Sequence, residues 1–199
     1  KTSLLRHMFP DAAYLSLDLP SAAETASTAP EELLRPHEGA ALIIDEVQYA
    51  PSLLRHLKVH IDKDRVPGRY LLTGSQSFSL MAGVSESLAG RCGILNLHSL
   101  SFGEARGARD GLERKEYIAR GGYPELYTGA EAGLWYPSYV ATYLERDVRN
   151  VLNVVELQSF NRFLRACALR TAQTINYANL ARDADIAPNT ARKWLSILE

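Results

Sequence analysis

Short apolar runs alternate with helical patterns through the first half of the chain. Four apolar runs predict strands, at residues 14–19, 40–47, 69–73 and 94–97. Helical patterns lie between them, at residues 52–62 and 78–88. Strands that alternate with helices in this way predict an α/β fold with a parallel sheet and right-handed β-α-β crossovers.

One run stands out because it is continuously apolar and ends in two acids. Residues 40–44 are Ala-Ala-Leu-Ile-Ile, which is typical of a central strand covered on both faces. Asp45 and Glu46 follow, at the edge of the sheet where open α/β folds bind ligands. Adjacent acids point in different directions, so one is able to hold Mg²⁺ through its water shell while the next orients or deprotonates a water. The alternative is a buried strand that runs into an ordinary polar turn.

Strand patterns end near residue 112, and helical patterns follow. We place a boundary at the cluster of Gly107, Asp110 and Gly111, which gives an α/β core over residues 1–112 and a helical region over residues 113–199. A strong amphipathic helix is predicted at 157–171, with one face formed by Phe160, Phe163, Leu164, Cys167, Ala168 and Thr171.

The last 24 residues predict two short helices around a tight turn, with Pro188 in the first turn of the second helix. The spacing of small and aromatic positions resembles a helix-turn-helix, at Ala181, Ala191 and Trp194. Asp185 replaces the usual turn glycine, and Ala187 replaces the usual serine cap. Four polar side chains are candidates to face DNA: Asn189, Thr190, Arg192 and Lys193. Residues 156–199 carry only six basic groups against four acids, so protein docking or a structural role is favoured over DNA.

Composition and charge narrow the class of protein. The 46% apolar and 23% charged fractions exclude disorder, collagen and low-complexity fibres. A net charge of −1 removes the simplest argument for a nucleic-acid or anionic-membrane partner. Cys92 and Cys167 form no CxxC pair and indicate a reducing compartment. No secretory signal or bilayer-spanning run is visible, so we predict a soluble, cytoplasmic protein with no membrane partner.

The first three residues, Lys1-Thr2-Ser3, fit the end of a phosphate-binding loop, G-x-x-x-x-G-K-[ST]. In such a loop the lysine reaches the β and γ phosphates, the hydroxyl ligates Mg²⁺, and loop amides with the helix N-terminus cradle the anion. The pair gains meaning from Asp45, which follows a helix and a strand 44 residues later. The loop glycines would precede Lys1, so we expect this chain to be a segment of a longer protein.

A second apolar strand ends in the small polar run Thr73-Gly74-Ser75-Gln76. If it neighbours the Asp45 strand, Thr73, Ser75 or Gln76 is placed to hydrogen-bond the attacking water or the γ-phosphate. An ordinary strand-to-helix turn capped by a serine is the alternative. Arg91 is a candidate charge clamp for phosphate, and a structural salt bridge explains it equally well.

Together these motifs resemble the prokaryotic AAA-type ATPases. In chain order, the matching segments are Lys1-Thr2, residues 43–48 with Ala50-Pro51, residues 72–75, 88–91, 100–104, 121–124 and 143–147. The resemblance covers nearly the whole chain. It implies a P-loop ATPase core followed by a helical domain of poorly known function that contains a winged helix, here at about residues 156–199 and cut short.

The resemblance also implies Mg·ATP as the cofactor and assigns roles to residues. Thr2 and Asp45 would hold Mg²⁺, and Glu46 would be the catalytic base. The further catalytic candidates are Arg91 and Ser75, and the nucleotide-binding candidates are Lys1, Thr2, Ser3, Thr73 and Gln76. An unidentified protein partner is expected, and a homo-oligomer is left open.

A different class of function is also consistent with the sequence. In that interpretation the chain is a DNA-binding or protein-docking module whose nucleotide site is vestigial, and the residues upstream of Lys1 would discriminate. His56 and His60 have the spacing of a metal pair, but no third ligand is evident and Leu57 stands where a zinc protease needs glutamate. A solvated helix face is the favoured explanation for the two histidines.

Overall fold

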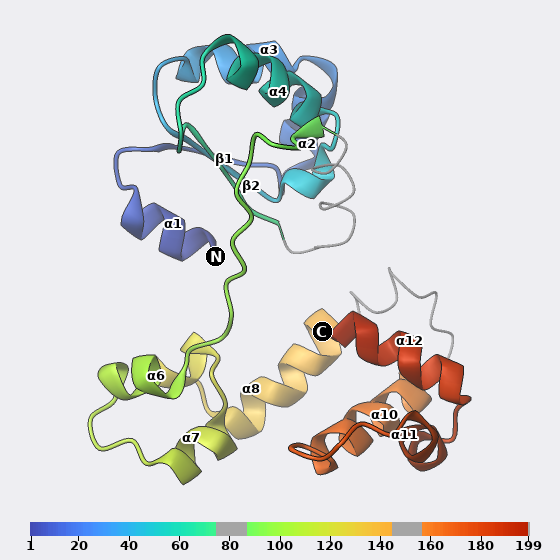
Figure 1. The fold of residues 1–199 in the computed structure, drawn as a ribbon. Coiled ribbons are helices and arrows are strands. Elements are labelled where there is room, and N and C mark those ends of the chain that lie inside the picture. Colours follow the sequence, from blue (N-terminus) through green and yellow to red (C-terminus); the bar gives the residue numbers. More distant parts are fainter. Residues whose placement is uncertain (75–86, 145–156, 199) are drawn as a thin grey trace. The chain divides into compact units, whose positions relative to one another are not determined.

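The computed structural model describes residues 1–74, 87–144 and 157–198 (Figure 1). The chain divides into two compact units, residues 1–98 and 99–199. The first unit contains a parallel sheet, whereas the described part of the second contains helices and connecting segments only. The predicted order, an α/β part followed by a helical region, is confirmed.

The sheet of the first unit has three parallel strands in the order β1-β2-β3. They are β1 (Ala13–Ser16), β2 (Leu42–Asp45) and β3 (Tyr70–Leu72). Ile44 pairs with Leu15 on one side and with Leu72 on the other. All four residues of β2 are buried, as predicted from its continuous apolar run.

Helices cover both faces of the sheet (Figure 1). One face packs against α2 (Pro20–Thr28), α3 (Pro30–Leu34) and α4 (Leu53–Lys63), with the short turns η1 (Arg35–His37) and η2 (Val47–Tyr49) beside them. The core there joins Leu42 and Ile44 to helix leucines, namely Leu34, Leu53, Leu54 and Leu57. The opposite face carries Asp45 and receives α1 (Thr2–Met8).

The predicted strand at residues 94–97 is wrong. These residues are irregular, and the side chains of Ile94 and Leu95 are 54% and 96% exposed. An apolar run becomes a strand only where a neighbouring strand completes its hydrogen bonds, and the described sheet does not extend to this segment. The predicted helix at 78–88 falls almost entirely outside the described residues.

The first part of the second unit is built from short helices joined by aromatic side chains. They are α6 (Phe102–Ala108), α7 (Arg114–Arg120), η3 (Pro124–Tyr127), α8 (Ala132–Tyr139) and the π-helical turn η4 (Val140–Leu144). Four rings form one cluster: Tyr123, Trp135, Tyr136 and Tyr139. Ser101 caps α6, because its hydroxyl accepts from the Glu104 N–H and the Glu104 carboxylate accepts from the Ser101 N–H.

Three further helices form a separate hydrophobic core: α10 (Leu157–Leu169), α11 (Tyr177–Ala184) and α12 (Pro188–Leu198). Buried aromatic and small residues fill this core, among them Phe160, Phe163, Ala181, Ala191 and Trp194. The helices and the position of Pro188 agree with the sequence pattern. Asp185 adopts the left-handed conformation, φ 57° and ψ 53°, so it takes the backbone geometry for which glycine is usual. Within the described ranges, no helix has the length and apolarity needed to cross a membrane.

Candidate functional site

Side chains from three elements meet at the buried carboxylate of Asp45, at the end of β2. The Thr2 hydroxyl on α1 donates to Asp45 Oδ2 at 2.7 Å, and the Tyr14 hydroxyl on β1 donates to the same oxygen at 2.8 Å. Thr73, just after β3, donates to Asp45 Oδ1. Only 5% of Asp45 is exposed, and its side chain is fixed by three hydroxyl donors of the chain.

The strand register explains why these residues meet. Because Ile44 pairs with Leu72, the next residues along the two strands, Asp45 and Thr73, lie side by side. Ser16 pairs with Asp45, so Tyr14, two residues earlier on β1, presents its side chain on the same face of the sheet. Helix α1 then brings Thr2 onto that face.

Burial and hydrogen bonding oppose each other at Asp45. Burial raises the pKa of the carboxyl, but hydrogen bonds from Thr73, Thr2, Tyr14 and the Glu46 backbone together outweigh it and lower the pKa below the ordinary value. Asp45 is therefore an anion at neutral pH. Burial, reinforced by the hydrogen bond to Asp45, raises the pKa of the Tyr14 phenol, which keeps that group a donor.

Lys1 lies at the same edge of the sheet. Its ammonium group donates to the carbonyl oxygen of Gly74 at 2.9 Å, one residue beyond Thr73. A cation, three hydroxyl groups and an anionic carboxylate therefore converge where β2 and β3 end. This is the edge at which open α/β sheets bind their ligands.

Glu46 follows Asp45 with an unusual backbone, φ 58° and ψ 42°, in the left-handed region. The sheet holds this geometry, because the Val47 N–H donates to the carbonyl oxygen of Thr73 at 3.1 Å. Gln48 donates through its side-chain amide to the Glu46 carboxylate. The two adjacent acids point to different partners, as their sequence position predicted.

Two other predicted site residues, Arg91 and Ser3, are not brought into this cluster. Arg91 forms a bidentate ion pair with Asp62 of α4, at 2.6 and 3.0 Å, which favours its structural alternative. Ser3 is exposed on α1. Ser75 and Gln76 lie outside the described residues.

Sequence reasoning missed Tyr14. The sequence signal for Tyr14 was weak. Tyr14 lies two positions before the end of β1, and its side chain reaches Asp45 only because β1 and β2 pair in the observed register. The same reasoning missed Glu31, whose two carboxylate oxygens contact His56 Nδ1 at 3.0 Å and His60 Nε2 at 2.9 Å. The histidine pair therefore binds a carboxylate of α3 instead of facing only water. The described residues contain no group of three or more His, Cys, Asp or Glu side chains arranged to hold a metal ion.

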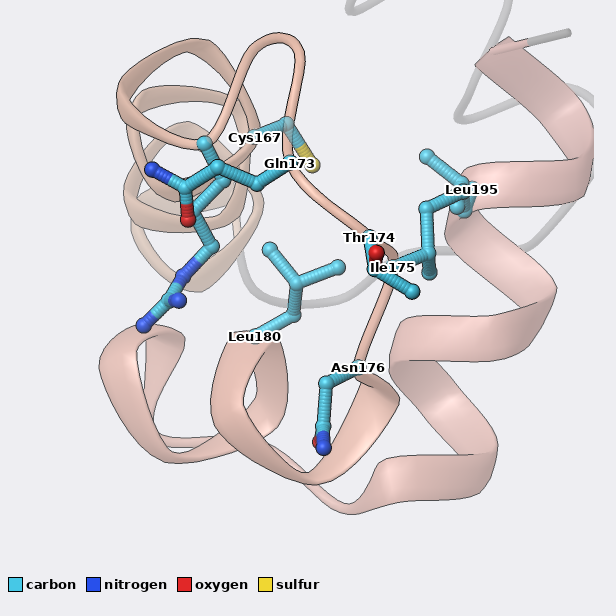
Figure 2. Close-up of a pocket in the computed structure, with 8 residues that line it drawn as sticks. Cys167, Gln173, Thr174, Ile175, Asn176, Leu180 and Leu195 are labelled. Carbon is cyan, nitrogen blue, oxygen red and sulfur yellow. The ribbon is translucent and has the colours of Figure 1, made fainter.

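A small cavity lies beside the α10–α12 core, lined largely by the exposed connection between α10 and α11, and its lining does not include the Asp45 cluster. Its volume is about 70 Å³, and Figure 2 shows Cys167, Thr174, Leu180 and Leu195 around it. Burial raises the pKa of the Cys167 thiol, so that group is a neutral part of the lining. Ligand pockets for organic molecules are several times larger, about 300–1,000 Å³. The cavity therefore has room for a few water molecules but not for a nucleotide.

Comparison with known families gives a match for each part of the chain. Residues 1–106, more than half of the chain, match the AAA domain family, and the chain belongs to that family. Residues 112–199 match a domain of unknown function, DUF8612. The predicted resemblance to AAA-type ATPases is confirmed at the level of family.

Two curated mycobacterial proteins are similar to the whole chain. They are the uncharacterized protein Mb2031c of Mycobacterium bovis and the uncharacterized protein Rv2008c of Mycobacterium tuberculosis, each 31% identical over 202 residues. The alignments cover 100% of this chain and 45% of each relative, so the chain spans a little under half the length of these relatives. No solved structure matches the chain significantly.

Proposed function

We propose that the unit containing the sheet binds ATP with Mg²⁺ and hydrolyses it, and that hydrolysis moves the helical region. The observation that carries this proposal is the hydrogen bond from Thr2 to the buried carboxylate of Asp45, two residues 43 positions apart. In AAA and other P-loop proteins, a hydroxyl and an acid from these two motifs hold the metal ion. Membership of the AAA domain family supports the same conclusion.

The residues present fit Mg²⁺. The cluster offers oxygen atoms only, which is the ligand type that Mg²⁺ prefers. Thr2 donates its hydrogen to Asp45, so the lone pairs of its oxygen remain available for a cation. Asp45 would hold the ion through water, and Lys1 would contact the phosphates. When bound, the ion would polarise the phosphoryl oxygens and neutralise part of their charge.

Glu46 is the proposed catalytic base. Its carboxylate is separate from the Asp45 cluster but adjacent in sequence, so a water next to the terminal phosphate would be oriented and deprotonated by Glu46 while Asp45 holds the metal. The amide of Gln48 keeps the Glu46 side chain in place. Thr73, Ser75 and Gln76 remain proposed contacts of the phosphate or of the attacking water. Arg91 could act as a charge clamp only after its ion pair with Asp62 breaks.

Two substitutions in the full-length protein test the proposal. Glu46→Gln should keep Mg·ATP binding but slow hydrolysis by a factor of about 100 or more, because it removes the base and leaves the metal site intact. Lys1→Ala should lose nucleotide binding. Glu24→Gln, an exposed acid on α2, is the control and should change neither quantity. Unchanged hydrolysis by the Glu46→Gln protein would remove Glu46 from the mechanism.

A second candidate function rests on α11 and α12. The left-handed turn at Asp185 lets the two helices pack on α10 as a helix-turn-helix would, and Asn189, Arg192 and Lys193 are exposed on α12. Arg192 is also engaged by Tyr177, with the guanidinium 5.3 Å from the ring centre. We therefore propose protein docking rather than DNA binding for this helix pair. A duplex-DNA affinity that falls steeply with added salt would reverse that preference.

A further inference from the structure

Asp45 is surrounded by more donors than its proposed metal role needs. A carboxylate has about four lone-pair positions. Three hydroxyls of the chain donate to them: Thr73 donates to Oδ1, and Thr2 and Tyr14 both donate to Oδ2, where they fill the two positions. A metal-bound water that hydrogen-bonds to Oδ2 must therefore replace one of the two donors there.

Two of the three donors are poorly suited to leave Asp45. Thr73 is only 7% exposed, so its hydroxyl would be left without water if it turned away from Asp45. Thr2 is itself a proposed ligand of the metal, and it can keep its hydrogen bond to Asp45 while its lone pairs face the ion.

Tyr14 differs from the other two donors. Tyr14 is 39% exposed, so water can hydrogen-bond to its hydroxyl once that group turns away from the carboxylate. The guanidinium of Arg6 lies 5.0 Å from the centre of the Tyr14 ring, which retains the ring beside α1 when the hydroxyl moves. Tyr14 and Thr2 also share one oxygen, Oδ2, so the departure of Tyr14 frees a position next to the hydroxyl of Thr2.

We propose that Tyr14 is a gate on the metal site: its hydroxyl competes with the metal-bound water for Asp45 Oδ2 and leaves when Mg²⁺ and nucleotide bind. The inference rests on the proposed function and assigns to Tyr14 a role that neither family match describes. Tyr14 is thus a positioning residue that acts through Asp45. Its effect has a definite sign, because removal of a competitor strengthens metal binding, whereas removal of a supporting group weakens it.

The first test measures Mg²⁺ affinity in the full-length protein, with a slowly hydrolysed ATP analogue present at saturation. Tyr14→Phe removes the competing hydroxyl and keeps the ring, so the half-saturating Mg²⁺ concentration should fall about fivefold, the equivalent of one net hydrogen bond. Tyr70→Phe is the matched control, because Tyr70 lies on β3 of the same sheet and its hydroxyl contacts His60 instead of Asp45. That variant should leave the Mg²⁺ requirement unchanged.

The second test observes Tyr14 directly by ¹⁹F NMR of protein labelled with fluorotyrosine, in which Tyr14→Phe identifies the resonance. The resonance should move when Mg²⁺ and the analogue are both present, and not with the analogue in a chelator. An unchanged or higher Mg²⁺ requirement in Tyr14→Phe, or a resonance that stays in place, would overturn the gate alone. Failure of the wild-type protein to bind the analogue with Mg²⁺ would overturn the proposed function and the gate together.

Discussion

At the residue scale, the backbone of Glu46 connects structure with the proposed chemistry. A non-glycine residue in the left-handed region costs on the order of 1–2 kcal/mol, and Glu46 is held there by hydrogen bonds on both sides of the turn. Strained backbone of this kind is common at functional sites, where interactions of the surrounding structure offset its energetic cost. The side chains of Asp45 and Glu46 have different hydrogen-bond partners, as the separate roles proposed for the two acids require.

Glu31 provides the pH-dependent prediction at this scale. Hydrogen bonds from His60 and His56 lower the pKa of the Glu31 carboxyl below its ordinary value of 4.5. Because the folded pKa is lowered, the contribution of Glu31 to stability is complete above the unfolded value and is lost as the pH falls through the folded value. Glu31→Gln should therefore lower the free energy of unfolding by about 0.2–1 kcal/mol at neutral pH, a small amount because the group is half exposed.

Urea unfolding at neutral pH and at several values below 4.5 would measure this contribution. The difference between wild type and Glu31→Gln should shrink as the pH falls. Glu32→Gln, an exposed acid on the same helix, is the control. A difference that stays constant through the acid range would mean that the ionised Glu31 is not what links α3 to α4.

The residues that sequence could predict are those fixed by motif order. Thr2 and Asp45 belong to two motifs of the family that the sequence resembles, in the same order along the chain, and the structure shows them in contact. Tyr14 and Glu31 depend instead on strand register and helix packing, which a pattern of apolar and polar positions does not specify to one residue. Long side chains that reach across elements were therefore the ones missed.

At the element scale, burial decides which apolar runs become strands. The run before Asp45 is paired on both sides and covered on both faces, so pattern and environment agree. The run at residues 94–97 has a similar composition but is exposed and irregular. Its local sequence contains no signal for the neighbouring strand that it would need, which is why the prediction failed there.

The connection after α7 gives the prediction at this scale. The Gly122 carbonyl accepts from the Leu100 N–H at 2.7 Å, and a methyl group at Gly122 would collide with the carbonyl oxygen of Leu100 and crowd Ser99. Gly122→Ala should therefore destabilise the protein by about 2 kcal/mol or more, since backbone atoms must move. Gly107, inside α6, faces open space at an ordinary φ, so Gly107→Ala should stabilise it by about 0.5–1 kcal/mol.

Thermal unfolding of the two variants beside wild type measures both effects. Opposite shifts in Tm are expected from the same chemical change, a single added methyl group. A Gly122→Ala protein as stable as wild type would show that Leu100 and Gly122 are not held together as the structure has them. Gly122 lies in residues 121–124, one of the segments that resembles the AAA-type ATPases, and the contact with Leu100 gives this glycine a structural reason.

At the scale of the whole molecule, three divisions of the chain do not coincide. The sequence pattern places the boundary at residue 112. The AAA domain match ends at residue 106, and the match to the domain of unknown function begins at residue 112. The compact units meet between His98 and Ser99. The predicted domains, 1–112 and 113–199, remain a proposal. What the described residues do show is that each unit has its own hydrophobic cluster, built from residues of that unit alone.

Separate cores predict separate responses to core mutations. Both tryptophans, Trp135 and Trp194, belong to the second unit, so tryptophan fluorescence reports on that unit only. Leu57→Ala in α4 and Phe163→Ala in α10 each remove a fully buried side chain and should cost about 2–5 kcal/mol. Phe163→Ala should lower the urea midpoint seen by fluorescence, whereas Leu57→Ala should leave that midpoint in place and shift only part of the far-UV circular dichroism transition.

If Leu57→Ala moved the fluorescence midpoint as far as Phe163→Ala does, the two cores would unfold as one cooperative unit. The proposed coupling between ATP hydrolysis and the helical region would then act within one cooperative folding unit, and would not require motion between two separate units.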